Sequence, residues 1–152
     1  MSRSMLCIFI FFWYSCIETK KTSVFHRLTH LDKVYEPLDS TDIGQEYQYI
    51  VISNPPNRLD SLFTLIQKYN DTTLNACTIE KQKNLYLRRF FKESTDTPID
   101  FENKNDFTSD YITDHTEDLL AFIEFNPKFG WTFKVKYQNR WKNIKEGLSC
   151  IN

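Results

Sequence analysis

Residues 119–144, LLAFIEFNPKFGWTFKVKYQNRWKNI, carry the pattern that decides the fold, an alternation of apolar and polar side chains. Such an alternation is typical of strands with one buried and one exposed face. We expect a strand over 119–125, a five-residue hairpin connection over 126–130 and a second strand over 131–137. A short turn and a third strand over 140–144 complete the pattern. The stretch therefore predicts a C-terminal antiparallel meander.

The inward face of this meander is aromatic, and a helix earlier in the chain is expected to cover it. Residues 45–53 alternate as a strand and end at two prolines, and residues 57–69 follow as the clearest helix. Because a helix that packs on a sheet needs one apolar stripe, the spacing of its apolar residues supports this assignment. We predict an α+β fold in which an antiparallel sheet packs on one principal helix. The stripe consists of Leu59, Leu62, Phe63, Ile66 and Tyr69.

Three other segments carry weaker patterns. Residues 78–94 fit either a helix or a strand that begins near Asn84, and their aromatic density favours the strand. Residues 93–118 are rich in acids and poor in aliphatic residues, which predicts a loop. Residues 16–44 are polar and irregular, so we interpret them as a tether ahead of a single domain over 45–152.

The N-terminal stretch CIFIFFWYSC, residues 7–16, is a separate signal. Residues 5–14 carry no charge, and Arg3 precedes them. A helix needs about 20 apolar residues to cross a bilayer, so this run is too short to span one. Its length, its basic flank and the small residue Ser15 at its end are typical of a signal peptide.

The order Ser15-Cys16 after this apolar run resembles the end of a bacterial lipoprotein signal peptide. The resemblance implies cleavage after residues 1–15, a lipid on Cys16 that anchors the chain in a membrane, and a tether over 16–44. It also implies a place in the bacterial cell envelope, on the inner or outer membrane, facing the periplasm or the cell surface. Two alternatives stay open, namely a cleaved signal without lipid and an N-terminal element of the fold itself.

Cysteine usage fits an exported protein. Cys7 lies inside the expected signal and Cys16 is the expected lipidation site, which leaves Cys77 and Cys150. In an oxidising compartment these two are candidates for one disulfide, worth about 3–4 kcal/mol in a loop of that length. Two unpaired thiols are the alternative, because sequence spacing does not establish how close the two Cα atoms lie.

Charge and composition exclude several classes of function. The net charge is −1 and the chain has three glycines, so neither a nucleic-acid groove nor a phosphate-cradling glycine loop is expected. His26 and His30 have the spacing of helical zinc ligands, but no acid lies between them and we interpret them as surface residues. The acids of residues 93–118 lack the glycine and the alternate spacing of a calcium loop. We therefore expect no nucleic-acid partner, no cofactor, no metal site and no catalytic residue.

Three residues are the candidates for binding. Arg88 and Arg89 stand between aromatic residues and could present guanidinium groups to an anion or to a partner's carboxylates. The alternative is that both are edge charges paired with the acidic loop. Trp141 lies on the short last strand and is the best candidate for an exposed contact, with core packing as its alternative.

These features favour a lipid-anchored, non-catalytic binding module of the cell envelope, attached to the membrane through Cys16 and possessing a protein partner. One alternative is a secreted or periplasmic hydrolase that uses acids of residues 93–118. The other is a protective inhibitor. A concave site that gathers His115 with two or more of those acids favours the hydrolase, whereas an aromatic patch favours the binding module.

Overall fold

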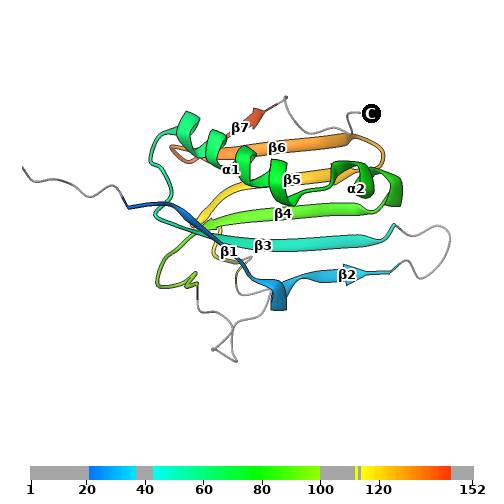
Figure 1. Ribbon diagram of the computed structural model, residues 1–152, viewed down its shortest axis with the longest axis horizontal. Helices are drawn as coiled ribbons and strands as arrows, with labels where there is room; N and C mark the ends of the chain where they lie inside the picture. The colour runs from blue at the N-terminus through cyan, green and yellow to red at the C-terminus, as the bar shows by residue number, and fades with distance from the viewer. Residues whose placement is uncertain (1–20, 37–42, 100–111, 113, 145–152) are drawn as a thin grey trace, which may run out of the picture.

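The computed structural model describes residues 21–36, 43–99, 112 and 114–144, and these form one mixed sheet of seven strands with two α-helices (Figure 1). The fold is therefore mixed α and β, as the sequence predicts at this level. The elements, in chain order, are β1 (Val24–Arg27), the short 3-10 helix η1 (Thr29–Leu31), β2 (Lys33–Tyr35), β3 (Gln45–Ser53), α1 (Leu59–Thr73), α2 (Ala76–Gln82), β4 (Leu85–Lys92), β5 (Leu119–Asn126), β6 (Gly130–Tyr137) and β7 (Arg140–Ile144).

The strands follow the order β1-β3-β4-β5-β6-β7, and β2 also pairs with β3. The predicted meander is confirmed, since β5, β6 and β7 pair in sequence order and antiparallel. The prediction of an antiparallel sheet holds for the other described pairs but is wrong for β3 and β4, which run parallel. The physical reason is the connection between the two strands. The helices α1 and α2 return the chain to the end of the sheet where β3 begins, so β4 runs in the same direction as β3.

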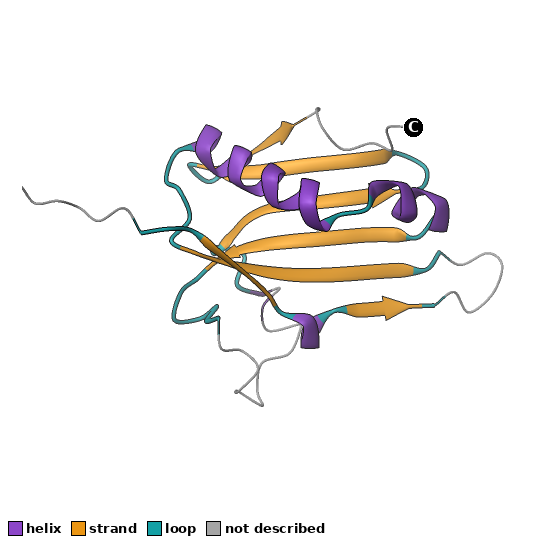
Figure 2. Cartoon of the chain, in the orientation of Figure 1, coloured by secondary structure: helices purple, strands orange, loops and turns teal. Residues whose placement is uncertain are grey.

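The two helices lie on one side of the sheet, in front of β4, β5 and β6 (Figures 1 and 2). The predicted helix is confirmed as α1 but continues to Thr73. A second helix, α2, was not predicted. The side chain of Asn75 caps its start by accepting a hydrogen bond from the Thr78 backbone at 3.0 Å, and Lys83 ends it in the left-handed conformation. The ambiguous segment 78–94 is thus a helix end followed by β4.

The main core lies between α1 and the sheet. Ile66 of α1 is fully buried, as are Phe90 of β4 and Ile123 of β5. Phe63 of α1 packs against Phe133 of β6, with the ring centroids 5.4 Å apart. The alternation of these strands directs each of these sheet residues to the same face. The buried members of this core are Ile50, Ile52, Leu62, Ile66, Phe90, Ala121, Ile123, Phe133 and Val135.

A second, smaller core lies on the opposite face of the sheet and is built partly by the N-terminal strands. Residues 24–27 and 33–35, which the sequence assigned to the tether, pair with β3 as β1 and β2, so that assignment is wrong for them. Leu28 and Leu31 are the reason, because they are buried against Val51. Residues 16–20 of the predicted tether lie outside the described residues. The second core contains Leu28, Leu31, Tyr49, Val51, Phe91 and Ile112.

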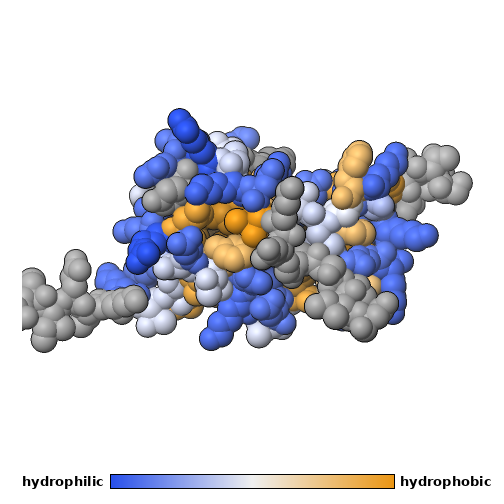
Figure 3. Space-filling model, turned by 90° about the horizontal axis from the view of Figure 1, so that it is seen from above, coloured by the Kyte–Doolittle hydropathy of each residue, from blue (hydrophilic) through white to orange (hydrophobic). Residues whose placement is uncertain are grey.

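The face seen from the β7 side is mainly hydrophilic, with hydrophobic residues gathered near its middle (Figure 3). Within the described part of the chain, no helix has both the length and the apolar character needed to cross a bilayer. The predicted signal peptide, residues 1–15, lies outside the described residues.

Candidate functional site

Arg88 is a fully buried charged residue on the helix-facing side of β4. Its side chain is 1% exposed, and it lies between Tyr86 and Phe90 on the same face of the strand. Gln48 is its direct neighbour in the parallel pairing of β3 with β4. The sequence reasoning expected a surface arginine, so it was wrong here. The strand alternation that places Tyr86 and Phe90 together on one face also includes Arg88, and this signal could have found it.

Neutral oxygen atoms satisfy the whole guanidinium group of Arg88. Its Nε and Nη2 atoms donate to Gln48 Oε1 at 3.0 and 2.7 Å. Its Nη1 atom donates to Asn70 Oδ1 at 2.7 Å and to Thr73 Oγ1 at 3.0 Å, and Nη2 also donates to the Thr73 carbonyl oxygen at 3.3 Å. Among the described residues, no carboxylate forms an ion pair with Arg88. The alternative of a charge paired with the acidic loop is not observed for this residue within the described part of that loop, residues 93–99, 112 and 114–118.

A pocket of about 190 Å³ opens beside Arg88, between the end of α1, the start of α2 and the strands β3 and β4. It contains charges of both signs, on Arg88 and Glu46. Gln48 lies between these two charges, because its Nε2 atom donates to Glu46 Oε1 at 2.8 Å while its Oε1 atom accepts from Arg88. The other residues that line the pocket are Thr73, Leu74, Asn75, Thr78, Ile79, Gln82 and Tyr86.

Tyr86 is a fixed hydrogen-bond donor in the wall of this pocket. Its hydroxyl group donates to Gln48 Oε1 at 2.8 Å. Burial raises the pKa of Tyr86 well above its usual range, and the nearby Arg88 charge opposes this only in part. Tyr86 therefore remains protonated at neutral pH and orients the Gln48 amide.

A second and larger hollow, which we call the basic cleft, has a volume of about 480 Å³ and lies at the start of α1. Of the described residues that line it, three are cationic, namely Arg58, Lys92 and Lys136, and none is acidic. They come from the loop before α1, the end of β4 and the end of β6. The remaining lining residues are Asn54, Pro55, Pro56, Asn57, Leu59, Leu62, Leu120 and Gln138.

Local structure makes the basic cleft favourable for negative charge. Arg58 is the N-cap residue of α1, and no side chain caps the helix there. The first backbone N–H groups of a helix carry partial positive charge and lack partners within the helix. The ammonium group of Lys136 is fixed by the carbonyl oxygens of Thr116 and Glu117, at 2.9 and 3.3 Å. Asp60, the acid in the first turn of α1, is not among the lining residues.

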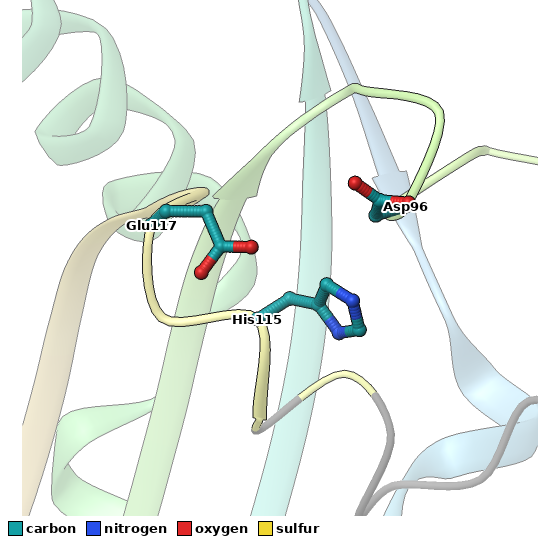
Figure 4. Close-up of side chains that lie close together, drawn as sticks. All are labelled: Asp96, His115 and Glu117. Atoms are coloured by element: carbon teal, nitrogen blue, oxygen red, sulfur yellow. The ribbon is translucent and has the colours of Figure 1, made fainter.

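A third group of residues joins the loop after β4 to the segment before β5. The ligand atoms of Asp96, His115 and Glu117 all lie within 4.8 Å of one another. Figure 4 shows the His115 ring between the two carboxyl groups. The carboxylate of Asp118 holds the two segments together, because it accepts hydrogen bonds from Ser94 and, at 3.0 Å, from Thr97 Oγ1.

One imidazole and two carboxylates are a ligand set that suits zinc, and the same groups can act as a general acid and base. The sequence reasoning expected no metal site here. It did single out His115 and the acids of residues 93–118, to which Asp96 and Glu117 belong. Asp96 and Glu117 are exposed, and none of the three residues lines the Arg88 pocket or the basic cleft. The gathering that would favour a hydrolase is thus present, but outside both hollows.

The other predicted site residues are dispersed. Arg89 lies on the opposite face of β4 from Arg88, so the two guanidinium groups do not form one site. Trp141 is 43% exposed and its ring centroid lies 5.2 Å from that of Phe122. Cys77 is disulfide-bonded. The predicted partner Cys150 and the predicted lipidation site Cys16 both lie outside the described residues.

No protein-family model, curated protein or solved structure matches this chain. The function is therefore argued from the geometry of these sites.

Proposed function

We propose that this chain is a non-catalytic binding module of the bacterial cell envelope, anchored by a lipid on Cys16, that holds an anionic ligand in the basic cleft. One observation carries the proposal: Arg58, Lys92 and Lys136 line one hollow of about 480 Å³, and no acid is found among the described residues of its lining. The chain as a whole has a net charge of −1, so this concentration of positive charge is local. A local cluster of cations in a concave site raises the concentration of anions there.

The lining indicates the chemistry of the ligand. Phosphate and carboxylate groups accept hydrogen bonds from arginine and lysine side chains and from free N–H groups at a helix start. Leu59, Leu62 and Leu120 add an apolar wall beside the cations. The ligand that fits best therefore has an anionic group attached to a short apolar group. An alkyl phosphate is a small probe with both features.

Calorimetric titration of the full-length chain with hexyl phosphate and with inorganic phosphate tests the cleft. We expect hexyl phosphate to bind more tightly, and Lys92→Gln and Arg58→Gln each to weaken its binding by roughly tenfold, since a hydrogen bond to a charged group is worth about 1.5–3 kcal/mol. Lys128→Gln is the matched control, because Lys128 is exposed in the turn between β5 and β6 and is not a cleft residue. Equal binding by all four proteins would reject the cleft.

The anchor needs a separate measurement. The intact mass of the N-terminus, after expression in a bacterial host with and without inhibition of the lipoprotein signal peptidase, reports the modification of Cys16. A diacylated or triacylated cysteine supports the envelope location. An unmodified terminus or a retained Met1 removes the anchor from the proposal and leaves the cleft to be judged by its own titration.

A hydrolase is the second candidate, and the proximity of His115 to Asp96 and Glu117 is the observation in its favour. Chromogenic ester, phosphoester and glycoside substrates, assayed with the wild-type chain and with His115→Gln, test it. Hydrolysis that disappears in this variant, while the protein remains folded, would favour the hydrolase. The remaining alternative is a protective inhibitor, and no feature of the described residues favours it specifically.

A further inference from the structure

We propose that the Arg88 pocket binds a small zwitterion of the α-amino-acid class, through Arg88 at one end and Glu46 at the other. This site goes beyond the proposed function, because it shares no lining residue with the basic cleft. Its volume of about 190 Å³ suits a molecule of that size rather than a large cofactor.

The first argument is the burial of a positive charge that has no carboxylate partner among the described residues. Moving a guanidinium group out of water costs free energy that a carboxylate normally offsets. Here Gln48, Asn70 and Thr73 supply only neutral oxygens. Arg88 nonetheless forms part of the wall of a pocket, so a carboxylate that enters the pocket meets an uncompensated positive charge in surroundings of low dielectric constant.

The second argument is the position of the opposite charge. Glu46 lines the same pocket but does not reach Arg88, because the Gln48 amide lies between them. The two charges are therefore held apart instead of neutralising each other. A ligand that carries a carboxylate and an ammonium group a few bonds apart complements both, whereas an ion with a single charge complements only one.

Access to Arg88 depends on Thr73. This residue is exposed at the last position of α1, and its hydroxyl and carbonyl oxygens are the acceptors nearest to solvent in the Arg88 network. Their contacts with Nη1 and Nη2, at 3.0 and 3.3 Å, are longer than the 2.7 Å bonds to Asn70 and Gln48. A ligand carboxylate would replace the two Thr73 contacts and bond both Nη atoms as a fork.

The polar side chains at the rim complete the recognition. Thr78 and Gln82 of α2 and Asn75 before it face the pocket with hydroxyl and amide groups, and Leu74 and Ile79 add apolar surface. These groups suit a short side chain that is small, polar or aliphatic. We therefore expect amino acids such as glycine, alanine and serine to bind better than aromatic ones.

The test is a calorimetric titration of the full-length chain with glycine, L-alanine, L-serine and L-phenylalanine, and with acetate and methylammonium as ions of a single charge. We expect saturable binding of the small amino acids at millimolar concentration or below, and binding of each single ion weaker by at least about tenfold. The proposal is overturned if no amino acid binds to the folded chain, or if acetate binds as tightly as alanine.

Variants locate the binding without touching Arg88. Thr78→Leu fills the pocket from its exposed rim and should abolish binding, whereas Thr64→Leu, on the exposed side of α1, should leave it unchanged.

Other variants separate the contributions of the two charges. Glu46→Gln should weaken the binding of amino acids but not the binding of acetate. Thr73→Ala should strengthen carboxylate binding, since it frees one N–H of Arg88. Lys92→Gln, in the basic cleft, should have no effect. If Thr78→Leu binds alanine as the wild type does, the site lies elsewhere and the inference fails.

Discussion

The Nη1 atom of Arg88 donates a hydrogen bond to Asn70 Oδ1 across 2.7 Å and so ties the centre of β4 to the last turn of α1. The other atom of the Asn70 amide, Nδ2, is buried and has no hydrogen-bond partner among the described residues. Asn70 is thus held in place by its acceptor atom alone. Asn70 and Thr73, which both lie beyond Tyr69, accept hydrogen bonds from Arg88, so the last turn of α1 is joined to the sheet.

Replacement of Arg88 by methionine should destabilise the chain strongly. The change keeps most of the side-chain length but leaves the buried Asn70 Oδ1 without its donor and Gln48 Oε1 with the Tyr86 hydroxyl as its remaining donor. A buried polar group left unpaired costs about 1–3 kcal/mol. We expect a loss of about 3 kcal/mol in the free energy of unfolding, measured by urea denaturation.

Arg89→Met is the matched control, because Arg89 is half-exposed on the opposite face of the same strand. We expect Arg89→Met to change the free energy of unfolding by at most about 0.5 kcal/mol, as for most surface substitutions. Comparable losses for the two variants would mean that the Arg88 network does not hold α1 to the sheet.

Local sequence patterns predict the parts of this fold that depend on local rules. The alternation from Trp131 to Val135 predicts β6 and its inward face, and the prolines at 55 and 56 predict the stop after β3. The parallel pairing of β3 with β4 has no local signature, because it depends on where α1 and α2 return the chain. The same is true of β1, whose few residues become a strand only when Phe25 pairs with Ile52 of β3.

The sites were less predictable than the fold, for the same physical reason. An arginine considered without its neighbours is expected at the surface. Gln48 and Asn70, 40 and 18 positions away, accept hydrogen bonds from Arg88 and so lower the free-energy cost of burying it. The basic cleft joins Arg58, Lys92 and Lys136 from three separate segments. His115 was singled out, but its proximity to Asp96 results from the two turns that Asp118 holds together.

Stability should fall at alkaline pH because of Tyr86. The pKa of an unfolded tyrosine is about 10, and burial raises the pKa of Tyr86 in the folded state above that value. The folded chain therefore keeps a proton that the unfolded chain releases. The contribution of Tyr86 is full below about pH 10 and is lost as the pH rises above it, with a slope of about 1.4 kcal/mol per pH unit.

Urea denaturation between pH 9 and pH 11 measures this slope, in a comparison of the wild type with Tyr86→Phe. The variant loses one hydrogen bond to Gln48 at every pH, but its stability should depend less steeply on pH. If the free energy of unfolding of Tyr86→Phe falls as steeply with pH as that of the wild type, Tyr86 does not retain its proton in the folded chain.

The bonding partner of Cys77 is a test that the lipid anchor could fail. Cys77 is disulfide-bonded, and we predict Cys150 as its partner. A sulfur atom that carries a lipid cannot also form a disulfide, so a bond from Cys77 to Cys16 is incompatible with lipidation. Mass spectrometry of a non-reduced digest identifies the linked peptide. We expect the Cys77–Cys150 peptide, and Cys150→Ser should cost about 3–4 kcal/mol of stability if the bond is unstrained.

Two phenylalanines of the meander should show which face of the sheet is the core. Phe133 of β6 is 3% exposed and packs on Phe63 of α1, whereas Phe122 of β5 is half-buried on the opposite face, beside Trp141. We expect Phe133→Ala to cost about 3–5 kcal/mol, as for other buried aromatic residues, and both Phe122→Ala and Trp141→Ala to cost about 1 kcal/mol. The measurement is urea denaturation of the three variants at neutral pH.

Because Phe122 and Phe133 have the same side chain on adjacent strands, differences in strand propensity and side-chain volume cancel when the two variants are compared. Equal costs would show that Phe122 and Trp141 are covered as completely as the helix-facing core, and would remove Trp141 from the candidates for an exposed contact.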